Sequence, residues 1–285
     1  MLSILIPVYN YPVLPLVNEL VKQCNDSGIT FEILCQDDAS NSQKNIQNQK
    51  INLIPHCSFF VNEVNLGRGK NINSLAQKAK QDWSLILDCD TFPTDSNFIQ
   101  KYIDDVSNSS KKIIFGVIIY ENKKPDKEQL LRWIYGQKRE TQSVLTSNLL
   151  IKKEVFLKYP FDESITKYGY EDLCFFSVLR KNNFEVSLIK NPTFHLNLET
   201  SDVFLNKTKI ALENLVFLYT SKKISSEDSK IIKAFELLKS LKLTQFSAFL
   251  LKRNQTKIEK NLLSENPSLF LFDLYKLGYF SSLKE

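Results

Sequence analysis

The chain has 285 residues, of which 43% are hydrophobic, 12% aromatic and 24% charged, with a formal net charge of +5. This length and apolar content are enough for one large domain with an appendage. No apolar run reaches the roughly 20 residues that cross a bilayer, and the first residues lack the basic start and long apolar core of a secretory signal. We therefore expect a cytoplasmic protein.

The charge is unevenly distributed along the chain. Residues 206–285 hold 14 Lys and Arg against 8 Asp and Glu, whereas residues 1–205 carry a net charge of −1. A basic tail can meet anionic lipid, nucleic acid or neither. No nucleic-acid-binding motif accompanies it, so we exclude nucleic acid as a partner. The five cysteines are odd in number and lack C-x-x-C spacing, which favours buried free thiols over disulfides or a zinc site.

The first ninety residues alternate predicted strands with predicted helices. The apolar runs predict strands at 2–6, 31–35, 57–61 and 83–87, and the helical spacing of apolar residues predicts helices at 12–24 and 72–80. This alternation is typical of βαβ units and a mostly parallel sheet. Ligands of such sheets bind at the carboxyl ends of the strands, where this sequence has polar clusters.

The rest of the chain changes character twice. Residues 95–200 mix predicted strands with predicted helices, and from Asp202 onward the pattern is helical, with amphipathic stretches at 203–218 and 231–238. We predict an α/β fold with a helical appendage, divided into residues 1–205 and 206–285. Within the mixed part, the strands are expected at 113–120, 144–151 and 184–189, and the helices at 127–138 and 171–179.

Two carboxylates end the fourth predicted strand. Asp88 and Asp90 are two residues apart, so along a strand they would point the same way. Hard oxygen ligands at such a strand end suit Mg²⁺ or Mn²⁺ bound together with a substrate phosphate. The alternative is ordinary turn chemistry, in which aspartate caps a loop.

Other polar clusters follow the strands. Asp38 could hydrogen-bond a uracil or a ribose, whereas Asp37 is better interpreted as a helix N-cap for the segment after Ser40. Arg68 and Lys70 lie between and after two glycines at an expected helix start, where a diphosphate can bind. The alternative for this segment is a glycine turn with solvated charges.

A third acidic cluster and a histidine lie further along. Glu171 and Asp172 follow aromatic residues and precede an apolar helix, which suits either a general base or a helix N-terminus favoured by its dipole. His195, at the end of an expected strand, is a candidate third metal ligand. A single histidine is more often a core residue, and this alternative stays open for it.

Taken in order, these elements resemble the inverting GT-A glycosyltransferases of family 2, over about residues 2–200. The motifs that carry the resemblance are Ile4-Leu5-Ile6-Pro7-Val8-Tyr9-Asn10, Gln36-Asp37-Asp38-Ala39-Ser40, Asn65-Leu66-Gly67-Arg68, Leu87-Asp88-Cys89-Asp90, Phe161-Asp162-Glu163, Tyr168-Gly169-Tyr170-Glu171-Asp172 and Phe194-His195.

The resemblance implies a role for each matching residue. The donor nucleotide would bind Pro7, Tyr9, Asp38, Arg68 and Asp88, with Tyr9 near the base, Asp38 on the uracil and Asp88 on the ribose. Mn²⁺ or Mg²⁺ on the diphosphate would be held by Asp90 and His195. Asp172 would be the general base, and Glu171 would orient the acceptor.

Two departures from the family pattern qualify what the resemblance implies. Tyr168 stands where family members often have Trp, so stacking on the acceptor could differ. Gln129, Arg132 and Trp133 match the Q-x-x-R-W pattern of processive polymerases, but here the pattern precedes the Glu-Asp pair and no membrane helix accompanies it. We interpret it as a local helix and predict the transfer of a single sugar.

The predicted function is the transfer of one sugar, from a UDP-sugar, to a hydroxyl of a glycan or lipid-linked acceptor in bacterial surface polysaccharide synthesis. Two other classes stay open. A nucleotidyltransferase that makes the sugar nucleotide shares the sheet and the carboxylate-bound ion but should have a glycine- and lysine-rich loop after strand one. A non-catalytic nucleotide-sugar binder would keep Asp38 and Asp90 and tolerate loss of Asp172. The basic, aromatic-rich tail predicts peripheral docking on the inner face of an anionic membrane.

Overall fold

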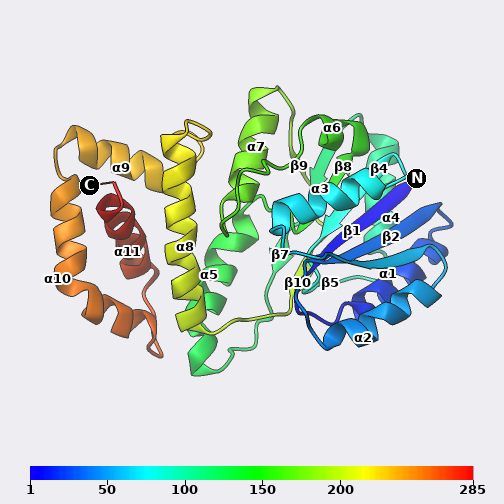
Figure 1. Cartoon of the computed structure of the whole chain (residues 1–285), viewed down its shortest axis with the longest axis horizontal. Coiled ribbons are helices and arrows are strands. Elements are labelled where there is room, and N and C mark those ends of the chain that lie inside the picture. Colours follow the sequence, from blue (N-terminus) through cyan, green and yellow to red (C-terminus); the bar gives the residue numbers. More distant parts are fainter. Residues whose placement is uncertain (285) are drawn as a thin grey trace. The chain divides into compact units, whose positions relative to one another are not determined.

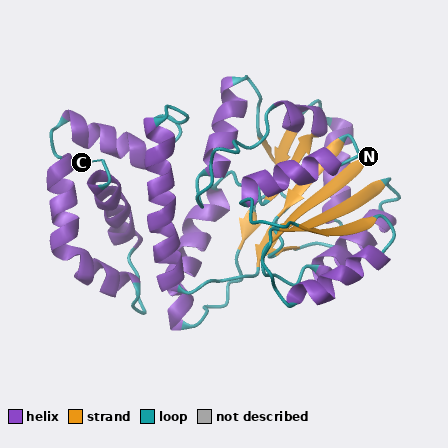
Figure 2. Cartoon of the chain, viewed as in Figure 1, coloured by secondary structure: helices purple, strands orange, loops and turns teal. Residues whose placement is uncertain are grey.

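The computed structural model describes residues 1–284 and forms two compact units (Figures 1 and 2). The first unit comprises residues 1–121, 140–166 and 178–197; the second comprises residues 122–139, 167–177 and the chain from Leu198 onward. The second unit is thus built from three segments. The predicted boundary between residues 205 and 206 lies inside helix α8 (Ser201–Thr220).

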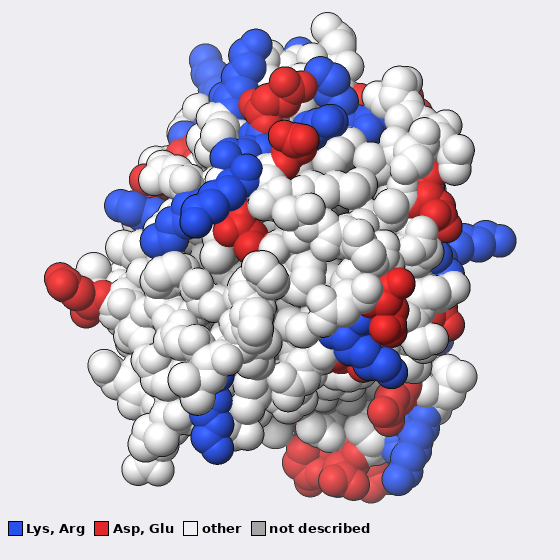
Figure 3. Space-filling view, turned by 90° about the vertical axis from the view of Figure 1, so that its right-hand side faces the viewer, with Lys and Arg blue, Asp and Glu red and all other residues white. Residues whose placement is uncertain are grey.

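The surface of the first unit carries both signs of charge. On the face shown in Figure 3, most groups of Lys and Arg stand beside Asp and Glu, and wide uncharged areas separate them. This interspersed distribution agrees with the near-zero net charge of the chain before residue 206. It gives no reason to expect a strongly basic or acidic partner on this face.

A seven-stranded sheet forms the centre of the first unit. Its strands lie in the order β3-β2-β1-β4-β8-β6-β9, and only β8 runs against the others. Strand β1 is buried along its whole length, as expected for a parallel strand covered on both faces. The strands are β1 (Leu2–Val8), β2 (Phe31–Asp37), β3 (Cys57–Val61), β4 (Trp83–Leu87), β6 (Ile113–Phe115), β8 (Asn148–Lys152) and β9 (Ser187–Leu188).

Helices cover both faces of this sheet (Figure 2). Helix α1 packs against α4 on one face, and α3 packs against α6 on the other. The α/β fold with a mostly parallel sheet, expected from the alternating pattern, is confirmed. The helices are α1 (Leu14–Asp26), α2 (Lys44–Asn48), α3 (Arg68–Lys78), α4 (Phe98–Asn108) and α6 (Lys153–Lys158), with a 3-10 turn at Gln49–Leu53.

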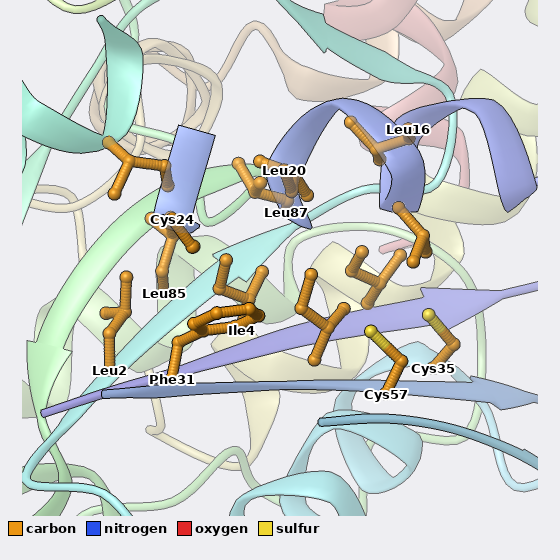
Figure 4. Close-up of a cluster of buried hydrophobic side chains, with 14 of the residues drawn as sticks. Leu2, Ile4, Leu16, Leu20, Cys24, Phe31, Cys35, Cys57, Leu85 and Leu87 are labelled. Atoms are coloured by element: carbon orange, nitrogen blue, oxygen red, sulfur yellow. The ribbon is translucent and has the colours of Figure 1, made fainter. Parts of the chain in front are cut away.

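The core under α1 follows directly from strand alternation. Leu2 and Ile4 point to the same face of β1 and meet Leu20 and Cys24 of α1, with Leu85 of β4 beside them (Figure 4). Each of these side chains is almost fully buried. Burying one such aliphatic side chain contributes roughly 1.5–3 kcal/mol, so this layer holds the strand ends in place.

A small second sheet belongs to the same unit. Its order is β5-β10-β7, made of β5 (Thr91–Pro93), β7 (Ile118–Ile119) and β10 (Thr193–His195). Strand β10 runs antiparallel to β5, with His195 opposite Thr91. This pairing joins two segments that are distant in sequence.

Three strand predictions need correction. The run at 113–120 is not one strand, because the chain breaks at Gly116 and enters the small sheet as β7. A Cβ at Gly116 would lie 2.2 Å from the carbonyl oxygen of Asn191, so the backbones approach too closely there for a regular strand. The strand predicted at 144–151 begins only at Asn148, and that at 184–189 is reduced to Ser187–Leu188. The strands at 57–61 and 83–87 have the predicted bounds.

The second unit is helical. Helix α11 contacts α5, α8, α9 and α10, and buried Phe204, Leu251, Phe272 and Tyr275 form its core. Helices α9 and α11 begin at serines whose hydroxyls accept backbone N–H groups. The predicted helical tail is confirmed. The helices are α5 (Leu130–Arg139), α8, α9 (Lys230–Ser240), α10 (Thr244–Leu262) and α11 (Leu269–Ser282); α7 (Glu171–Lys181) starts in this unit, and 3-10 turns precede and follow α5 at Lys127–Gln129 and Glu140–Gln142.

Two expectations from composition can be compared with the structure. Within residues 1–284, no helix combines the length and apolar content that a bilayer crossing requires. The five cysteines are free, and all but Cys89 are buried. Burial raises the pKa of Cys57 to about 11 and that of Cys24 to about 12, so these thiols are inert at neutral pH.

Candidate functional site

Polar residues gather at the carboxyl edge of the large sheet. Strands β1, β2 and β4 are parallel and neighbouring, so Tyr9, Asp38 and Asp88, which follow them, meet at this edge. Tyr9 is 60% exposed. Pro7 is buried within β1, and because the β1–β4 register ends at Leu5, its missing N–H lies past that ladder.

Asp38 is almost fully buried and anchors the loop that leads into α3. Its Oδ1 accepts hydrogen bonds from the Asn62 side chain at 2.9 Å and the Leu66 N–H at 2.8 Å, and its Oδ2 accepts from the Gly67 N–H at 2.8 Å. Charge-assisted bonds of this kind are about twice as strong as neutral ones. The carboxylate therefore fixes the 62–68 loop at the start of a helix, where a negative charge is favoured.

Asp37 has a local role. Its two carboxylate oxygens accept from the Ser40 N–H at 2.9 Å and the Ser40 hydroxyl at 2.6 Å, and the residue is fully buried. The expected helix N-cap is therefore wrong, and the two bonds close a turn instead. This turn does not start a helix, since α2 begins later, at Lys44.

Arg68 joins the loop to the end of β4. Its Nε and Nη2 both donate to Oδ1 of Asp88, at 3.0 and 2.6 Å, and its Nη1 donates to the Thr146 hydroxyl at 2.8 Å. Both bonds to Asp88 end on the same oxygen, so the pair occupies one side of that carboxylate. The two side chains are about one quarter exposed, so the ion pair is accessible to solvent at the carboxyl edge of the sheet.

Helix α3 starts four residues earlier than predicted. Gly67 precedes it with φ +82°, a conformation that L side chains rarely adopt, and Arg68 is its first residue. The expected pair of cations is thus in the first helical turn. Lys70 lies 3.8 Å from Glu163 across an exposed contact, which contributes little.

Asp90 and His195 come together through the small sheet. Because His195 pairs with Thr91, its imidazole reaches the neighbouring Asp90, and Nε2 lies 3.6 Å from Oδ2 of that carboxylate. The Leu196 N–H also donates to the Asp90 carbonyl at 2.8 Å. Two ligands each about 2.1 Å from an ion can lie up to about 4.2 Å apart, so this pair has the spacing of a shared cation.

The imidazole of His195 is held by an aromatic ring. Tyr120 stacks on it with centroids 5.3 Å apart and planes at 26°, and the Tyr120 hydroxyl donates to Glu140. Nδ1 of His195 is buried and has no hydrogen-bond partner within residues 1–284. Over the same residues, no group of three or more His, Cys, Asp and Glu side chains could hold a metal ion by itself. A carboxylate with an imidazole suits Mn²⁺ that takes its remaining ligands from substrate phosphate and water.

Glu171 and Asp172 belong to the second unit. Both lie in the first turn of α7, directly after Gly169 and Tyr170, whose φ angles are +96° and +64°. The Asn214 side chain of α8 donates to the Gly169 carbonyl and, at 3.4 Å, to that of Lys167. The helix-dipole interpretation fits this position, and the assignment as general base and acceptor-orienting residue stays a prediction.

The Q-x-x-R-W segment lies in the second unit, at the start of α5. Gln129 donates to the Leu198 carbonyl at 2.6 Å, and Arg132 is buried with its guanidinium 5.2 Å from the Phe204 ring centroid. The predicted local helix is present. Two of the motif's polar side chains are engaged in holding the unit together.

Sequence reasoning missed Thr146, Asn62 and Tyr120. Thr146 reaches the edge because β8 runs antiparallel to β4, with Asn148 opposite Leu87, so the residues before β8 face the end of β4. Asn62 directly follows β3, where the edge rule could have found it. Tyr120 was placed at the end of a strand, and only the break at Gly116 turns it toward His195.

Known proteins share features with this chain in both sequence and fold. A family model described as glycosyl transferase family 2 matches residues 3–161. Among solved structures, S. aureus TarS 1–349 is 17% identical with a TM-score of 0.53, over 75% of this chain and 65% of that one. PcManGT from Pyrobaculum calidifontis, solved with GDP-Man and Mn²⁺, is 10% identical with a TM-score of 0.55, over 77% and 64%.

A third structure, GalNAc-T7 with UDP, GalNAc and Mn²⁺, is 15% identical with a TM-score of 0.55, over 70% of this chain and 43% of that one. The chain therefore spans less than two thirds of the length of these proteins. At such identities the likeness shows the fold, which is the GT-A fold that the motifs implied. No curated protein sequence matches the chain.

Proposed function

The chain belongs to glycosyl transferase family 2, and on this premise we propose that it is a metal-dependent, inverting enzyme. It would move a single sugar from a nucleotide sugar, a UDP-sugar in the first instance, to a hydroxyl group. The observation that carries the proposal is the Asp90–His195 pair, 3.6 Å apart, beside an Asp88–Arg68 ion pair at the same sheet edge.

The donor nucleotide is assigned to the carboxyl edge. The exposed Tyr9 ring offers a stacking surface for the base, and Asp88 offers Oδ2 to a ribose hydroxyl while Arg68 holds Oδ1. An ionised carboxylate has about four acceptor positions. The 62–68 loop takes three of those on Asp38, which leaves one for the imide N–H of a uracil. Pro7 contributes by shaping the buried strand below Tyr9.

The residues present fit a divalent cation, with Asp90 and His195 as its two protein ligands. Bound together with the donor, Mn²⁺ or Mg²⁺ would supply Lewis-acid stabilisation of the departing diphosphate. The imidazole favours Mn²⁺ over Mg²⁺. The protein itself would have to hold Oδ2 of Asp90 and Nε2 of His195 on the same side of the diphosphate, and the β5–β10 pairing and the stacked Tyr120 ring support that role.

Asp172 is proposed as the general base. It would accept the proton of an acceptor hydroxyl as that oxygen attacks the anomeric carbon opposite the leaving diphosphate, which inverts the centre. Glu171 would orient the acceptor. The left-handed turn at Gly169 and Tyr170 supports this assignment, because it fixes the direction in which the first turn of α7 presents its carboxylates.

The acceptor is proposed to be a glycan, free or lipid-linked, in bacterial surface polysaccharide synthesis. The setting would be the cytoplasm or the inner face of the membrane. Transfer of one sugar per acceptor is supported by the engagement of Gln129 and Arg132 in structural contacts. Products carrying several sugars added by this one protein would contradict that part of the proposal.

A thermal-shift screen of nucleotide sugars with and without Mn²⁺ tests the donor assignment. Ligand at about 100 times its Kd stabilises the folded state by about 2.7 kcal/mol, so the cognate donor should raise the melting temperature measurably. The shift should need Mn²⁺ and should be lost in Asp90→Ala and His195→Ala. Asp26→Ala, an exposed change on α1, is the matched control. A donor-induced shift that is equal in all four proteins would refute the site.

Release of nucleotide from the cognate donor tests catalysis. We expect Asp172→Asn to lose two or more orders of magnitude in rate, roughly 3 kcal/mol of barrier. A change of less than about threefold would remove Asp172 from the mechanism. A nucleotidyltransferase would instead consume a nucleoside triphosphate and a sugar phosphate and release pyrophosphate, and a non-catalytic binder would release no nucleotide at all.

A further inference from the structure

The exposed surface where α9 turns into α10 combines apolar and basic side chains and contains no acid. Residues 237–258 include five Lys and Arg and no Asp or Glu. Six large apolar side chains in this segment are exposed, and each of the five cations is exposed as well. We define this set as the basic apolar surface: Leu237, Leu241, Leu243, Phe246, Phe249 and Leu250, with Lys239, Lys242, Lys252, Arg253 and Lys257.

Helical geometry places the central members on one face. In α10, Phe246, Phe249, Leu250 and Arg253 recur at intervals of three and four residues, so they line one side of the helix. The opposite side buries Ala248, Leu251 and Leu262 in the second unit. The exposed phenylalanines are therefore not part of the core of the second unit, since α10 contributes a separate buried face to that core.

A hollow opens beside this surface between α10 and α11. Its volume is about 540 Å³, and its lining includes Phe249, Leu251, Lys252, Gln255 and Tyr279. The lining contains a cation and no carboxylate. An apolar hollow with a basic rim has the chemistry that accepts part of an anionic amphiphile.

We propose that the basic apolar surface docks on an anionic lipid bilayer, with the aromatic and leucine side chains entering the interface and the cations contacting lipid phosphates. The charge favours this occupant over a second copy of the chain, because two copies of the same acid-free face would repel each other. Bulky apolar side chains with Lys and Arg on an exposed helix are typical of interfacial binding.

Cosedimentation of the full chain with vesicles tests the proposal. The assay compares vesicles of phosphatidylcholine that contain about a third phosphatidylglycerol, an anionic lipid, with vesicles of pure phosphatidylcholine. Both are measured at low and at high salt. Each cation near an anionic surface contributes about fivefold in partitioning. We expect Lys252→Glu with Arg253→Glu to reduce binding at least ~25-fold and Phe246→Ser with Phe249→Ser at least ~10-fold.

Matched controls lie elsewhere in the same unit. Lys123→Glu with Lys124→Glu changes the net charge equally at exposed positions, and Phe270→Ser removes an exposed aromatic ring at the start of α11. Both controls should bind like the wild type. Since the assay needs no donor or acceptor, its result is independent of the proposed sugar transfer.

Three outcomes would overturn the proposal. Absence of binding to anionic vesicles at low salt, equal binding to neutral vesicles, or equal loss in the control variants would each remove it. If instead the wild type were a dimer by sedimentation velocity and Phe246→Ser with Phe249→Ser made it monomeric, the surface would be an interface between copies. Circular dichroism of every variant confirms that α10 has kept its helix.

Discussion

Two carboxylates, one in each unit, show how differently the units are held together. Asp38 accepts three hydrogen bonds, two of them from backbone N–H groups of the 62–68 loop. Glu259 in α10 also has three partners, but all are side chains: Tyr275 at 2.9 Å, Gln255 at 3.0 Å and Lys209 at 3.2 Å. The first carboxylate fixes the path of the chain, whereas the second joins helices that apolar packing has already positioned.

The contrast extends to the surroundings of each carboxylate. In the first unit, Arg68, Asp88 and Thr146 continue the polar contacts along the sheet edge. In the second unit, aromatic rings dominate, and Phe204, Tyr135 and Phe272 contact one another. Removal of a polar side chain should therefore destabilise the first unit most. An added side-chain atom in a packed position should destabilise the second unit most.

The largest effect is expected at Asp38. Asp38→Ala leaves the Leu66 N–H without its acceptor and leaves the Gly67 N–H only the Asn65 side-chain oxygen at 3.2 Å, so we expect a loss of about 3 kcal/mol in unfolding free energy. Asp38→Asn keeps one acceptor oxygen and should lose about half as much. Urea denaturation with Asp26→Ala as the exposed control measures both. A change below about 0.5 kcal/mol in Asp38→Ala would show that the loop does not depend on this carboxylate.

The predicted and observed surroundings of Asp38 also show what sequence alone can predict. Its position at the sheet edge followed from strand alternation, and the strands at 57–61 and 83–87 have their predicted bounds. Its hydrogen-bond partners could not be predicted, because the spacing of apolar residues does not indicate which N–H groups of a loop will point toward a buried carboxylate. The motif order matched to a known family placed Asp90 near His195, which spacing alone could not do.

The failures have physical causes too. The strand at 113–120 looked continuous because Ile113–Tyr120 is apolar, and the close approach of Gly116 to Asn191 is a tertiary contact without a local signal. Thr146 reaches Arg68 only because β8 is antiparallel, and strand direction is not encoded in a short apolar run. The sequence around Asp172 suits both a general base and a helix N-terminus, and the family pattern was needed to choose between them.

The second prediction concerns added bulk in the second unit. Gly169 has φ +96°, and a Cβ there would lie 2.5 Å from the Cβ of Ala211 in α8. Gly169→Ala should lose about 2–3 kcal/mol of stability through strain and overlap. It should also reduce kcat, because the loop leads directly to Glu171 and Asp172.

A double-mutant cycle sharpens this prediction. Ala211→Gly removes the clashing carbon at a helix cost of about 1 kcal/mol. In the Gly169→Ala background, relief of the overlap should about cancel this cost, which corresponds to a coupling energy of about 1 kcal/mol by thermal denaturation. Strictly additive changes would mean that backbone strain alone, and not packing against α8, limits position 169.

The third prediction tests an aromatic contact inside the polar unit. Tyr120→Leu removes the ring that stacks on His195, so we expect the apparent Kd for Mn²⁺, measured by electron paramagnetic resonance with the donor nucleotide present, to rise about fivefold, or about 1 kcal/mol. Tyr120→Phe keeps the ring and removes the hydroxyl that donates to Glu140, so its effect should be about twofold. Equal effects in the two variants would mean that the hydroxyl, not the stacking, matters.

The smallest effect is expected at Glu259, where the comparison began. Burial opposes its ionisation, but hydrogen bonds from Gln255, Tyr275 and Lys209 lower its pKa below the usual value. A carboxyl with a lowered folded pKa contributes stability that is present above its unfolded pKa, near 4.3, and is lost as the pH falls through the folded pKa. Because the group is partly exposed, this contribution at pH 7 should be less than about 1 kcal/mol.

Glu259→Gln isolates that contribution, since it keeps a hydrogen-bond acceptor and removes the charge. The variant should be slightly less stable than the wild type at pH 7, and the difference should shrink as the pH falls below about 4.3. Urea denaturation at a series of pH values measures it, with Glu227→Gln, an acid outside this network, as the control. If Glu259→Gln lost as much as Asp38→Ala, charge would hold the helices as firmly as it holds the loop, and the contrast between the units would fail.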